Sequence, residues 1–124
     1  MGDPRHDLGL AAERAVAAWL SAAGWTVLHR RLRSEHGGEV DLVARDPYDV
    51  LVAIEVRARR SDRAGAAAWS VDRRRIGRLR RTLAGIGRRH GWHAGMRVDL
   101  VTVEPMAGTG GRWRLRRIPG IDDG

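Results

Sequence analysis

The most constraining feature of the chain is a pair of apolar, β-branched runs separated by a short polar cluster. The runs cover residues 37–45 and 50–59, and Asp-Pro-Tyr-Asp at 46–49 lies between them. This pattern is typical of a β-hairpin, because proline next to aspartate favours a turn between two strands. Acidic residues interrupt both runs at positions where a plain buried strand is apolar. The hairpin is therefore expected to carry charged side chains that need a physical explanation.

Strand parity predicts which of these side chains share a face, because side chains alternate along a strand and directly paired residues point the same way. A turn centred on Tyr48 pairs Asp41 with Glu55 and Glu39 with Arg57. This register brings two carboxylates together, with Cβ atoms about 5 Å apart. The other face is then expected to be an unbroken apolar surface of Val40, Leu42, Val52, Ile54 and Val56.

Two facing carboxylates destabilise a sheet unless a cation offsets their repulsion. Hard oxygen ligands at this spacing suit Mg²⁺, which typically takes one or two carboxylates, several waters and a substrate phosphate. The alternative is a solvated face on which Glu39–Arg57 and Asp41–Arg59 form cross-strand ion pairs, since antiparallel sheets often expose one face. The residues alone leave both interpretations open.

A first helix is expected before the hairpin, over residues 7–23, because apolar residues recur there at spacings of three and four. Asp7 is a candidate N-cap, and Gly24 a candidate for the residue just past the helix end. Glu13 projects from the border of the apolar stripe. A border glutamate is commonly a solvated flank, so its spacing alone does not assign it a role.

A second helix is expected after the hairpin, from a cap at Ser70 to about His90. Strands are expected over 25–32, 97–103 and 112–118, and the tail over 119–124 is expected to fray. The element order is then α-β-β-β-α-β with a further short strand, which predicts a mixed sheet flanked by helices. The chain is expected to be one domain over 1–124, with a core at about 8–103.

The net charge is +8, and all 23 basic residues are arginine. A surplus of this size favours a polyanionic partner, most often nucleic acid. The second helix carries much of the charge opposite its apolar stripe, and a solvated basic face is the alternative there. The residues expected to contact a phosphate backbone are Arg59 in the preceding loop and Arg73, Arg74, Arg75 and Arg78 on the helix.

Other function classes are narrowed by what the sequence lacks. Cysteine is absent, which excludes disulfides and thiolate metal sites. No apolar run approaches the roughly 20 residues of a membrane span, and the first residues do not resemble a signal peptide. The chain is therefore expected to be soluble and cytoplasmic.

The charged motifs resemble the PD-(D/E)xK nuclease superfamily, in which an Asp is followed on the next strand by Glu-x-Lys. The resemblance is closer to the UPF0102 (YraN-like) family of small bacterial proteins, related to archaeal Holliday junction resolvases. Glu13 matches that family's helical Glu, residues 38–42 its Gly-Glu-x-Asp-Leu motif, and residues 55–59 its Glu-Val-Lys-x-Arg motif. Val71 with the arginines after it matches the basic helix, and residues 97–99 match the last strand.

The resemblance implies a restriction-endonuclease-like α/β fold with an α-β-β-β-α-β core. By analogy it also implies Mg²⁺- or Mn²⁺-dependent hydrolysis of DNA, including branched recombination and repair intermediates. Asp41 and Glu55 would ligate the metal, and Glu13 would be an outer-shell ligand or a water-orienting carboxylate. Resolvase-like relatives often act as dimers, so a homodimer is a further expectation, although the sequence has no interface signal.

Arg57 stands where the superfamily has its catalytic lysine. Arginine keeps the positive charge, but it cannot be deprotonated and its forked head is larger. Because the whole chain lacks lysine, the exchange is consistent with codon bias as well as with altered chemistry. Arg57 is expected to stabilise charge that develops on the phosphate, with reduced or substrate-restricted activity. The rival hypothesis is a non-catalytic nucleic-acid-binding module that keeps the fold.

Overall fold

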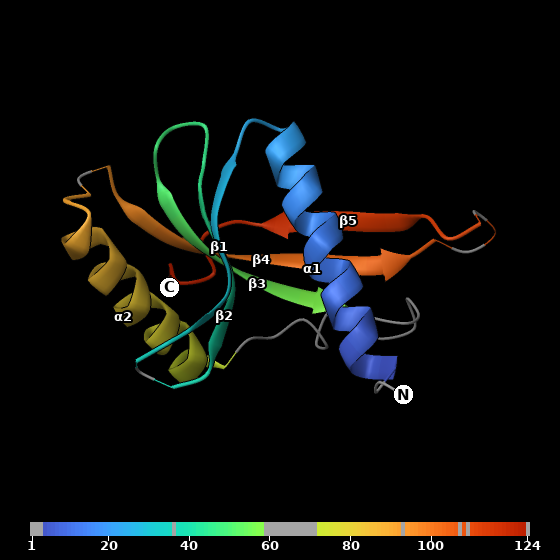
Figure 1. The fold of residues 1–124 in the computed structure, drawn as a ribbon, viewed down its shortest axis with the longest axis horizontal. Coiled ribbons are helices and arrows are strands. Elements are labelled where there is room, and N and C mark those ends of the chain that lie inside the picture. Colours follow the sequence, from blue (N-terminus) through green and yellow to red (C-terminus); the bar gives the residue numbers. More distant parts are fainter. Residues whose placement is uncertain are drawn as a thin grey trace.

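A five-stranded mixed sheet forms the centre of the structure, with one helix packed against each face (Figure 1). The computed structural model describes residues 4–35, 37–58, 72–92, 94–106, 108 and 110–123. Its elements are α1 (Pro4–Ala22), β1 (Thr26–Arg33), β2 (Glu39–Arg45), β3 (Leu51–Ala58), α2 (Arg73–Arg89), β4 (Met96–Pro105) and β5 (Trp113–Ile118). The predicted element order is confirmed, and the strand bounds differ from the predicted ones by no more than two residues.

The strands lie in sequence order across the sheet, from β1 at one edge to β5 at the other. β3 and β4 are parallel, and every other neighbouring pair is antiparallel. Parallel neighbours need a crossover connection, and α2 supplies it between β3 and β4. The architecture is therefore the predicted α/β class, a mixed sheet flanked by helices, and it is consistent with a restriction-endonuclease-like core.

Both faces of the sheet are buried by apolar side chains. The cluster beneath α1 includes Ala12, Val16, Leu20, Leu42, Val52, Ile54, Val101 and Val103. The cluster beneath α2 includes Val40, Val43, Leu51, Ala53, Leu79, Leu83, Ile86 and Val98. Since helices cover β3 on both sides, its first four residues are all apolar and fully buried. Glu55 is the first charge in that strand.

The hairpin has the predicted register, with Val43 paired with Ala53. The β2–β3 ladder runs from the Arg45–Leu51 pair to the Leu42–Ile54 pair and ends there. The predicted unbroken apolar face is wrong at one position, because Val40 packs in the cluster beneath α2 rather than with Leu42. Parity across the hairpin does not reach Val40, since that residue lies beyond the paired segment.

Helix α1 begins at Pro4, so Asp7 lies in its first turn and is not the predicted N-cap. An acidic side chain there is still favourable, because the helix dipole is positive at that end. Gly24 lies just past the helix end, as predicted, and its φ is +90°. The Trp25 N–H donates to the Leu20 carbonyl at 3.0 Å, and the Gly24 N–H donates to the Ser21 carbonyl at 3.2 Å. This pair of hydrogen bonds is a Schellman C-cap, a motif that favours glycine at the position of Gly24.

Helix α2 is capped by Asp72, whose side chain accepts from the Arg74 N–H at 2.9 Å. The predicted cap at Ser70 lies outside the described residues. His90 is the C-cap, as expected. No helix in the described part of the chain is long and apolar enough to cross a membrane.

The tail was predicted to fray, and this is wrong for residues 120–122. The Ile121 N–H donates to the Val98 carbonyl at 2.9 Å. Asp122 accepts from the Val98 N–H at 3.0 Å and pairs with Arg80 of α2 at 3.0 Å. These bonds hold the tail against β4 and α2. No periodic pattern in the sequence predicts them.

Candidate functional site

Asp41 and Glu55 meet at the point where the β2–β3 ladder ends. The last paired residues are Leu42 and Ile54, so the next position on each strand carries a carboxylate. Beyond that pair the Asp41 side chain takes over a backbone role, because its Oδ2 accepts the Val56 N–H at 2.8 Å. The predicted facing arrangement of the two carboxylates therefore agrees with the register of the hairpin.

The environment of Asp41 raises the pKa of its carboxyl to about 7. Burial is the largest cause, and the negative charge of Glu55 is the second. The Val56 N–H and the positive charge of Arg75 act in the opposite direction, while Glu13 adds to the rise. A carboxyl with a raised pKa is typical of functional sites, although structural ion-pair networks also raise pKa values.

Glu55 is 5% exposed and is held by Arg75 from the first turns of α2. The Arg75 Nε donates to Oε2 of Glu55 at 2.9 Å, and Nη2 lies 2.9 Å from the same oxygen. The pKa of the Arg75 guanidinium is raised, first by this hydrogen bond. The Glu55 carboxylate is therefore not solvated, as the alternative interpretation required, because α2 covers this part of the hairpin.

Arg75 also joins the segment before Asp41 to the site. Its Nη2 donates to the Glu39 carbonyl at 3.0 Å. Gly38 has a φ of +74°, and a Cβ added there would lie 3.5 Å from Nη1 of Arg75. Glycine at this position therefore suits the left-handed backbone conformation, whereas the distance to the guanidinium would also admit a Cβ.

Arg57 approaches Glu55 without bonding to it. Its Nε lies 3.7 Å from Oε1, too far for a hydrogen bond. This Nε is buried and has no hydrogen-bond partner, although the side chain as a whole is 38% exposed. A buried donor left unpaired is costly, and it marks a position where an acceptor is missing.

The Glu39–Arg57 ion pair of the alternative interpretation is not formed within the described residues. Glu39 instead lies 3.7 Å from Arg31 of β1, whose Nε is also 3.9 Å from Glu13 of α1. Arg31 has a positive φ of 51°, so the edge strand is distorted where its side chain enters the site. The other ion pair of the alternative interpretation is Asp41–Arg59, and Arg59 lies outside the described residues.

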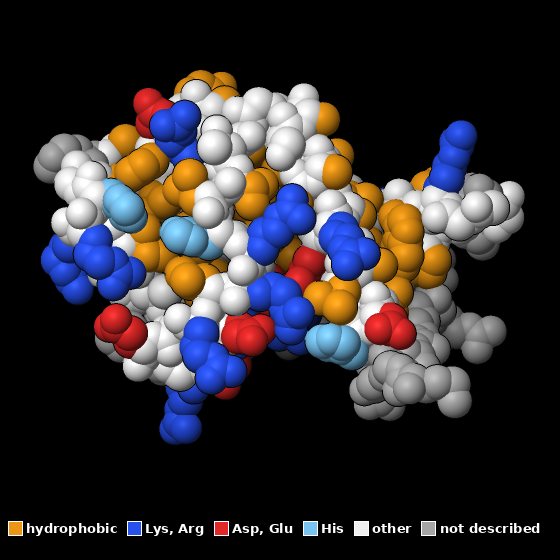
Figure 2. All heavy atoms as spheres, viewed as in Figure 1, with side chains coloured by type: hydrophobic (Ala, Val, Ile, Leu, Met, Phe, Trp, Pro, Cys, Tyr) orange, Lys and Arg blue, Asp and Glu red, His pale blue; other side chains and the backbone are white. Residues whose placement is uncertain are grey.

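Glu13 of α1 is linked to Glu39 through Arg31, and its charge adds to the raised pKa of Asp41. Burial raises the pKa of the Glu13 carboxyl, and the nearby Glu39 charge adds to the effect while Arg31 and His6 oppose it. Figure 2 shows acidic and basic side chains gathered next to one another on the face where α1 lies. Arg31 was not predicted as a site residue, since nothing in its strand pattern distinguishes it from Arg30 and Arg33.

The arginines predicted to contact nucleic acid separate into different roles. Arg73 and Arg74 are exposed at the start of α2, Arg78 is half-buried, and Arg75 points into the carboxylate site. Arg59 lies outside the described residues. Spacing on a helical wheel could not single out Arg75, because its partner comes from another element.

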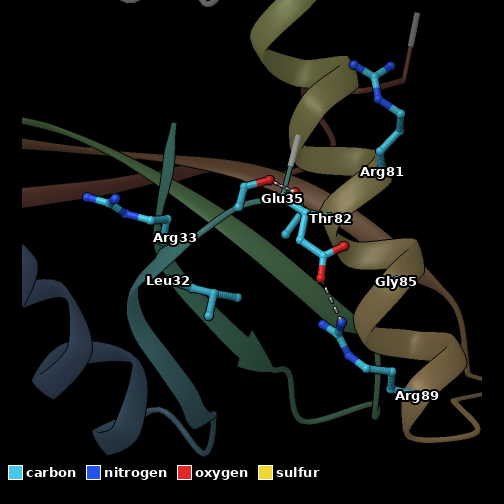
Figure 3. Close-up of a pocket in the computed structure, with 8 residues that line it drawn as sticks. Leu32, Arg33, Glu35, Arg81, Thr82, Gly85 and Arg89 are labelled. Atoms are coloured by element: carbon cyan, nitrogen blue, oxygen red, sulfur yellow. Dashed lines mark hydrogen bonds and ion pairs between the residues drawn. The ribbon is translucent and has the colours of Figure 1, made fainter. Parts of the chain in front are cut away.

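The loop that leads into β2 is held against α2, which positions the start of the acidic strand. Figure 3 shows the cleft between them, with Glu35 and Arg89 pointing toward one another across it. Their charged atoms are 3.7 Å apart, and the Ser34 and Thr82 hydroxyls are 2.6 Å apart. Arg33 and Arg81 line the same cleft but extend away from it.

The Arg97–Asp99 motif lies away from the carboxylate pair. Asp99 pairs with Ile54 and therefore points to the α1 side of the sheet, opposite Glu55. It is fully buried, and accepts from Arg97 at 2.7 and 3.1 Å, from Arg117 at 3.0 Å and from the Gly120 N–H at 3.0 Å. This motif therefore ties β4, β5 and the tail together, which is a structural role.

The donor set of the site suits a hard divalent cation. Within the described residues, no group of three or more acidic or histidine side chains could hold a metal ion. Two carboxylates with waters and substrate oxygens completing the shell is a common arrangement for Mg²⁺. Oδ1 of Asp41 and Oε1 of Glu55 accept no hydrogen bond from the described residues, because the bonded oxygens are Oδ2 and Oε2. The two carboxylates therefore fit such an ion.

Comparison with known proteins gives a consistent family. The model described as uncharacterised protein family UPF0102 matches residues 12–103. A UPF0102 protein of Mycolicibacterium vanbaalenii is 38% identical over 96% of this chain and 91% of its own length. A UPF0102 protein of Symbiobacterium thermophilum is 39% identical over 90% of this chain and 92% of its own. A third relative, from Burkholderia lata, is 40% identical over 78% of this chain and 68% of its own.

Proposed function

The chain belongs to the UPF0102 family, and we propose that it is a metal-dependent endonuclease that hydrolyses phosphodiester bonds in DNA. The observation that carries the proposal is the meeting of Asp41 and Glu55 at one point, in a protein with a net charge of +8. The mutual repulsion of the two carboxylates opposes folding, although the Val56 N–H and Arg75 each offset part of it. Two neighbouring carboxylates are expected at this point if they bind a cation that contacts the substrate.

Asp41 and Glu55 would hold Mg²⁺ or Mn²⁺, which supplies Lewis acidity and a hydroxide nucleophile when bound. Arg75 fixes the Glu55 carboxylate through Oε2 and leaves Oε1 free of hydrogen bonds from the described residues. Glu13 of α1, whose charge acts on Asp41, would orient a water molecule.

Arg57 is suited to receive a phosphate oxygen beside the two carboxylates. Its buried Nε has no hydrogen-bond partner, and Glu55 is 3.7 Å away. A guanidinium there would stabilise charge on the phosphate, but it would not accept a proton from water. We therefore expect slow or substrate-restricted cleavage. Branched recombination and repair intermediates are the substrates that the family resemblance favours.

The direct test is incubation of the purified protein with Mn²⁺ and linear, single-stranded and four-way-junction DNA. An Asp41→Ala/Glu55→Ala variant is the control for contaminating nucleases. The proposal expects cleavage of at least one substrate by the wild type and none by the variant. Equal cleavage by both proteins would contradict it.

A non-catalytic nucleic-acid-binding module is the second candidate. The observation in its favour is that two arginines already surround Glu55, which offsets its charge without a metal. This candidate predicts DNA binding that is sensitive to salt but indifferent to Mn²⁺, and that survives Asp41→Ala.

A further inference from the structure

The sheet continues past the carboxylate pair, and its register shows which side chains follow on the same face. Arg57 of β3 is paired with Thr102 of β4, and Thr102 is paired with Arg116 of β5. Directly paired residues on neighbouring strands point to the same side of a sheet. Arg57, Thr102 and Arg116 therefore form a row that crosses three strands.

This row lies on the same side of the sheet as the carboxylate site. Glu55 and Arg57 are two residues apart on β3, and Glu55 contacts α2 through Arg75. On β5, Arg117 and the residues that alternate with Arg116 point to the α1 side of the sheet. Arg117 donates to Asp99 at 3.0 Å, and its guanidinium lies 5.2 Å from the Trp25 ring centroid. The alternating residues Arg114 and Arg116 consequently point to the α2 side.

The β5 arginines of this face are available to a ligand. Arg114 and Arg116 are both exposed. Neither has an ion-pair partner within 4.0 Å in the described part of the chain, in contrast to Arg117. Beyond the carboxylate pair, one acid shares the face, because Arg114 is paired with Glu104 of β4. Arg57 and the two β5 arginines together outnumber that acid.

We propose that Arg114 and Arg116 of β5 extend the phosphate-binding surface of the site, so that a nucleic-acid strand crosses the sheet from Glu55, past Arg57, to β5. This inference rests on the proposed function, because the carboxylates define where the reacting phosphate lies. Guanidinium groups bind phosphates through two parallel hydrogen bonds, which suits a row of arginines to a phosphodiester backbone.

The length of the row is enough for more than one phosphate. Neighbouring strands are about 4.8 Å apart, so the backbones at Arg57 and Arg116 are separated by roughly 10 Å. Arg116 would therefore meet a different phosphate of the strand from the one at Arg57. The contact reads position and not sequence.

The test compares DNA binding by the wild type, an Arg114→Gln/Arg116→Gln variant and an Arg30→Gln/Arg45→Gln control. All four arginines are exposed, so both variants lose the same charge. Binding of fluorescein-labelled duplex is measured by anisotropy at several salt concentrations in EDTA. We expect the β5 variant to bind at least about 10-fold more weakly, and its salt slope to fall by about two. The control should change far less.

Equal weakening by the control, or no weakening by the β5 variant, would overturn the inference, as would wild-type protein that binds no DNA. Mn²⁺ titration of the β5 variant separates this result from the nuclease proposal. Retained Mn²⁺ heat with weakened DNA binding supports the surface. Loss of DNA binding by the β5 variant, together with wild type that never cleaves, would keep the surface and reject the nuclease.

Discussion

Arg75 of α2 holds Glu55 of β3 through two nitrogens of one guanidinium, both 2.9 Å from the same carboxylate oxygen. The Glu55 side chain is 6% exposed, so without this contact it would be a nearly buried charge. The same guanidinium also binds the Glu39 carbonyl. Arg75 therefore connects the basic helix to both strands of the acidic hairpin.

Replacing Arg75 with alanine should destabilise the protein by about 2–3 kcal/mol, because the Glu55 charge loses its closest partner. Arg74→Ala is the matched control, since Arg74 is exposed and its backbone N–H, not its side chain, makes the bond to Asp72. The control should change stability by no more than about 0.5 kcal/mol. Urea unfolding of both variants measures the difference, and equal midpoints would show that Arg75 does not hold the hairpin.

The Asp41 carboxyl should make the metal-free protein less stable as the pH rises. Its folded pKa of about 7 lies above the unfolded value of 3.8. The folded state therefore binds the proton more tightly, and the stability that this binding contributes is complete below about pH 4 and lost as the pH rises through 7. The Asp41→Asn variant cannot ionise at this position, so its stability does not fall with rising pH for this reason. Its amide oxygen still accepts the Val56 N–H.

We therefore expect Asp41→Asn to be more stable than the wild type at pH 8 in EDTA, by on the order of 2–4 kcal/mol. The difference should shrink toward pH 5. Thermal unfolding of the two proteins at several pH values measures it. A gap that does not vary with pH would mean that Asp41 titrates normally in the folded protein.

Asp99→Asn should unfold the protein more easily without affecting the carboxylate site. The substitution leaves Arg97 and Arg117 without the buried charge that both contact. We expect the free energy of unfolding to fall by about 2–4 kcal/mol. This is somewhat less than for a fully buried ion pair, because both arginines are partly exposed. Mn²⁺ binding, measured below the unfolding temperature, should equal that of the wild type. A loss of Mn²⁺ binding in the folded variant would place Asp99 in the site.

Arg57→Lys tests whether the arginine limits the proposed reaction. Lysine at this position would keep the charge, remove the unpaired Nε and introduce a group that can lose a proton. We expect cleavage at least about 10-fold faster than wild type, with unchanged Mn²⁺ affinity. A variant that binds Mn²⁺ and DNA but cleaves no faster would show that Arg57 does not limit the rate.

The fold was largely predictable because its main signals are local. Alternation and turn residues predicted the hairpin, and its register followed from the turn and from keeping the charges off the apolar face. The Gly24 end of α1 was also predictable, because a positive φ favours glycine. Asp7 was misassigned because a good cap residue can equally lie within a first turn.

The site was only half predictable, since its other half depends on long-range contacts. The carboxylates come from two adjacent strands, directly after their last pair, Leu42–Ile54. Arg75 and Arg31 come from different elements, and their orientation is set by the packing of α2 and by the distorted edge strand. The bound tail was missed for the same reason, because the contacts of Asp122 with Val98 and Arg80 leave no periodic signal.

The central claim is that Asp41 and Glu55 hold a divalent cation, and isothermal titration with Mn²⁺ tests it most directly. The wild type and Asp41→Asn are titrated side by side at pH 8, where the Asp41 carboxyl is mostly ionised given its pKa of about 7. The account predicts a saturable heat for the wild type that disappears in Asp41→Asn, with both proteins folded. Equal heats in the two proteins, or none in the wild type, would contradict it.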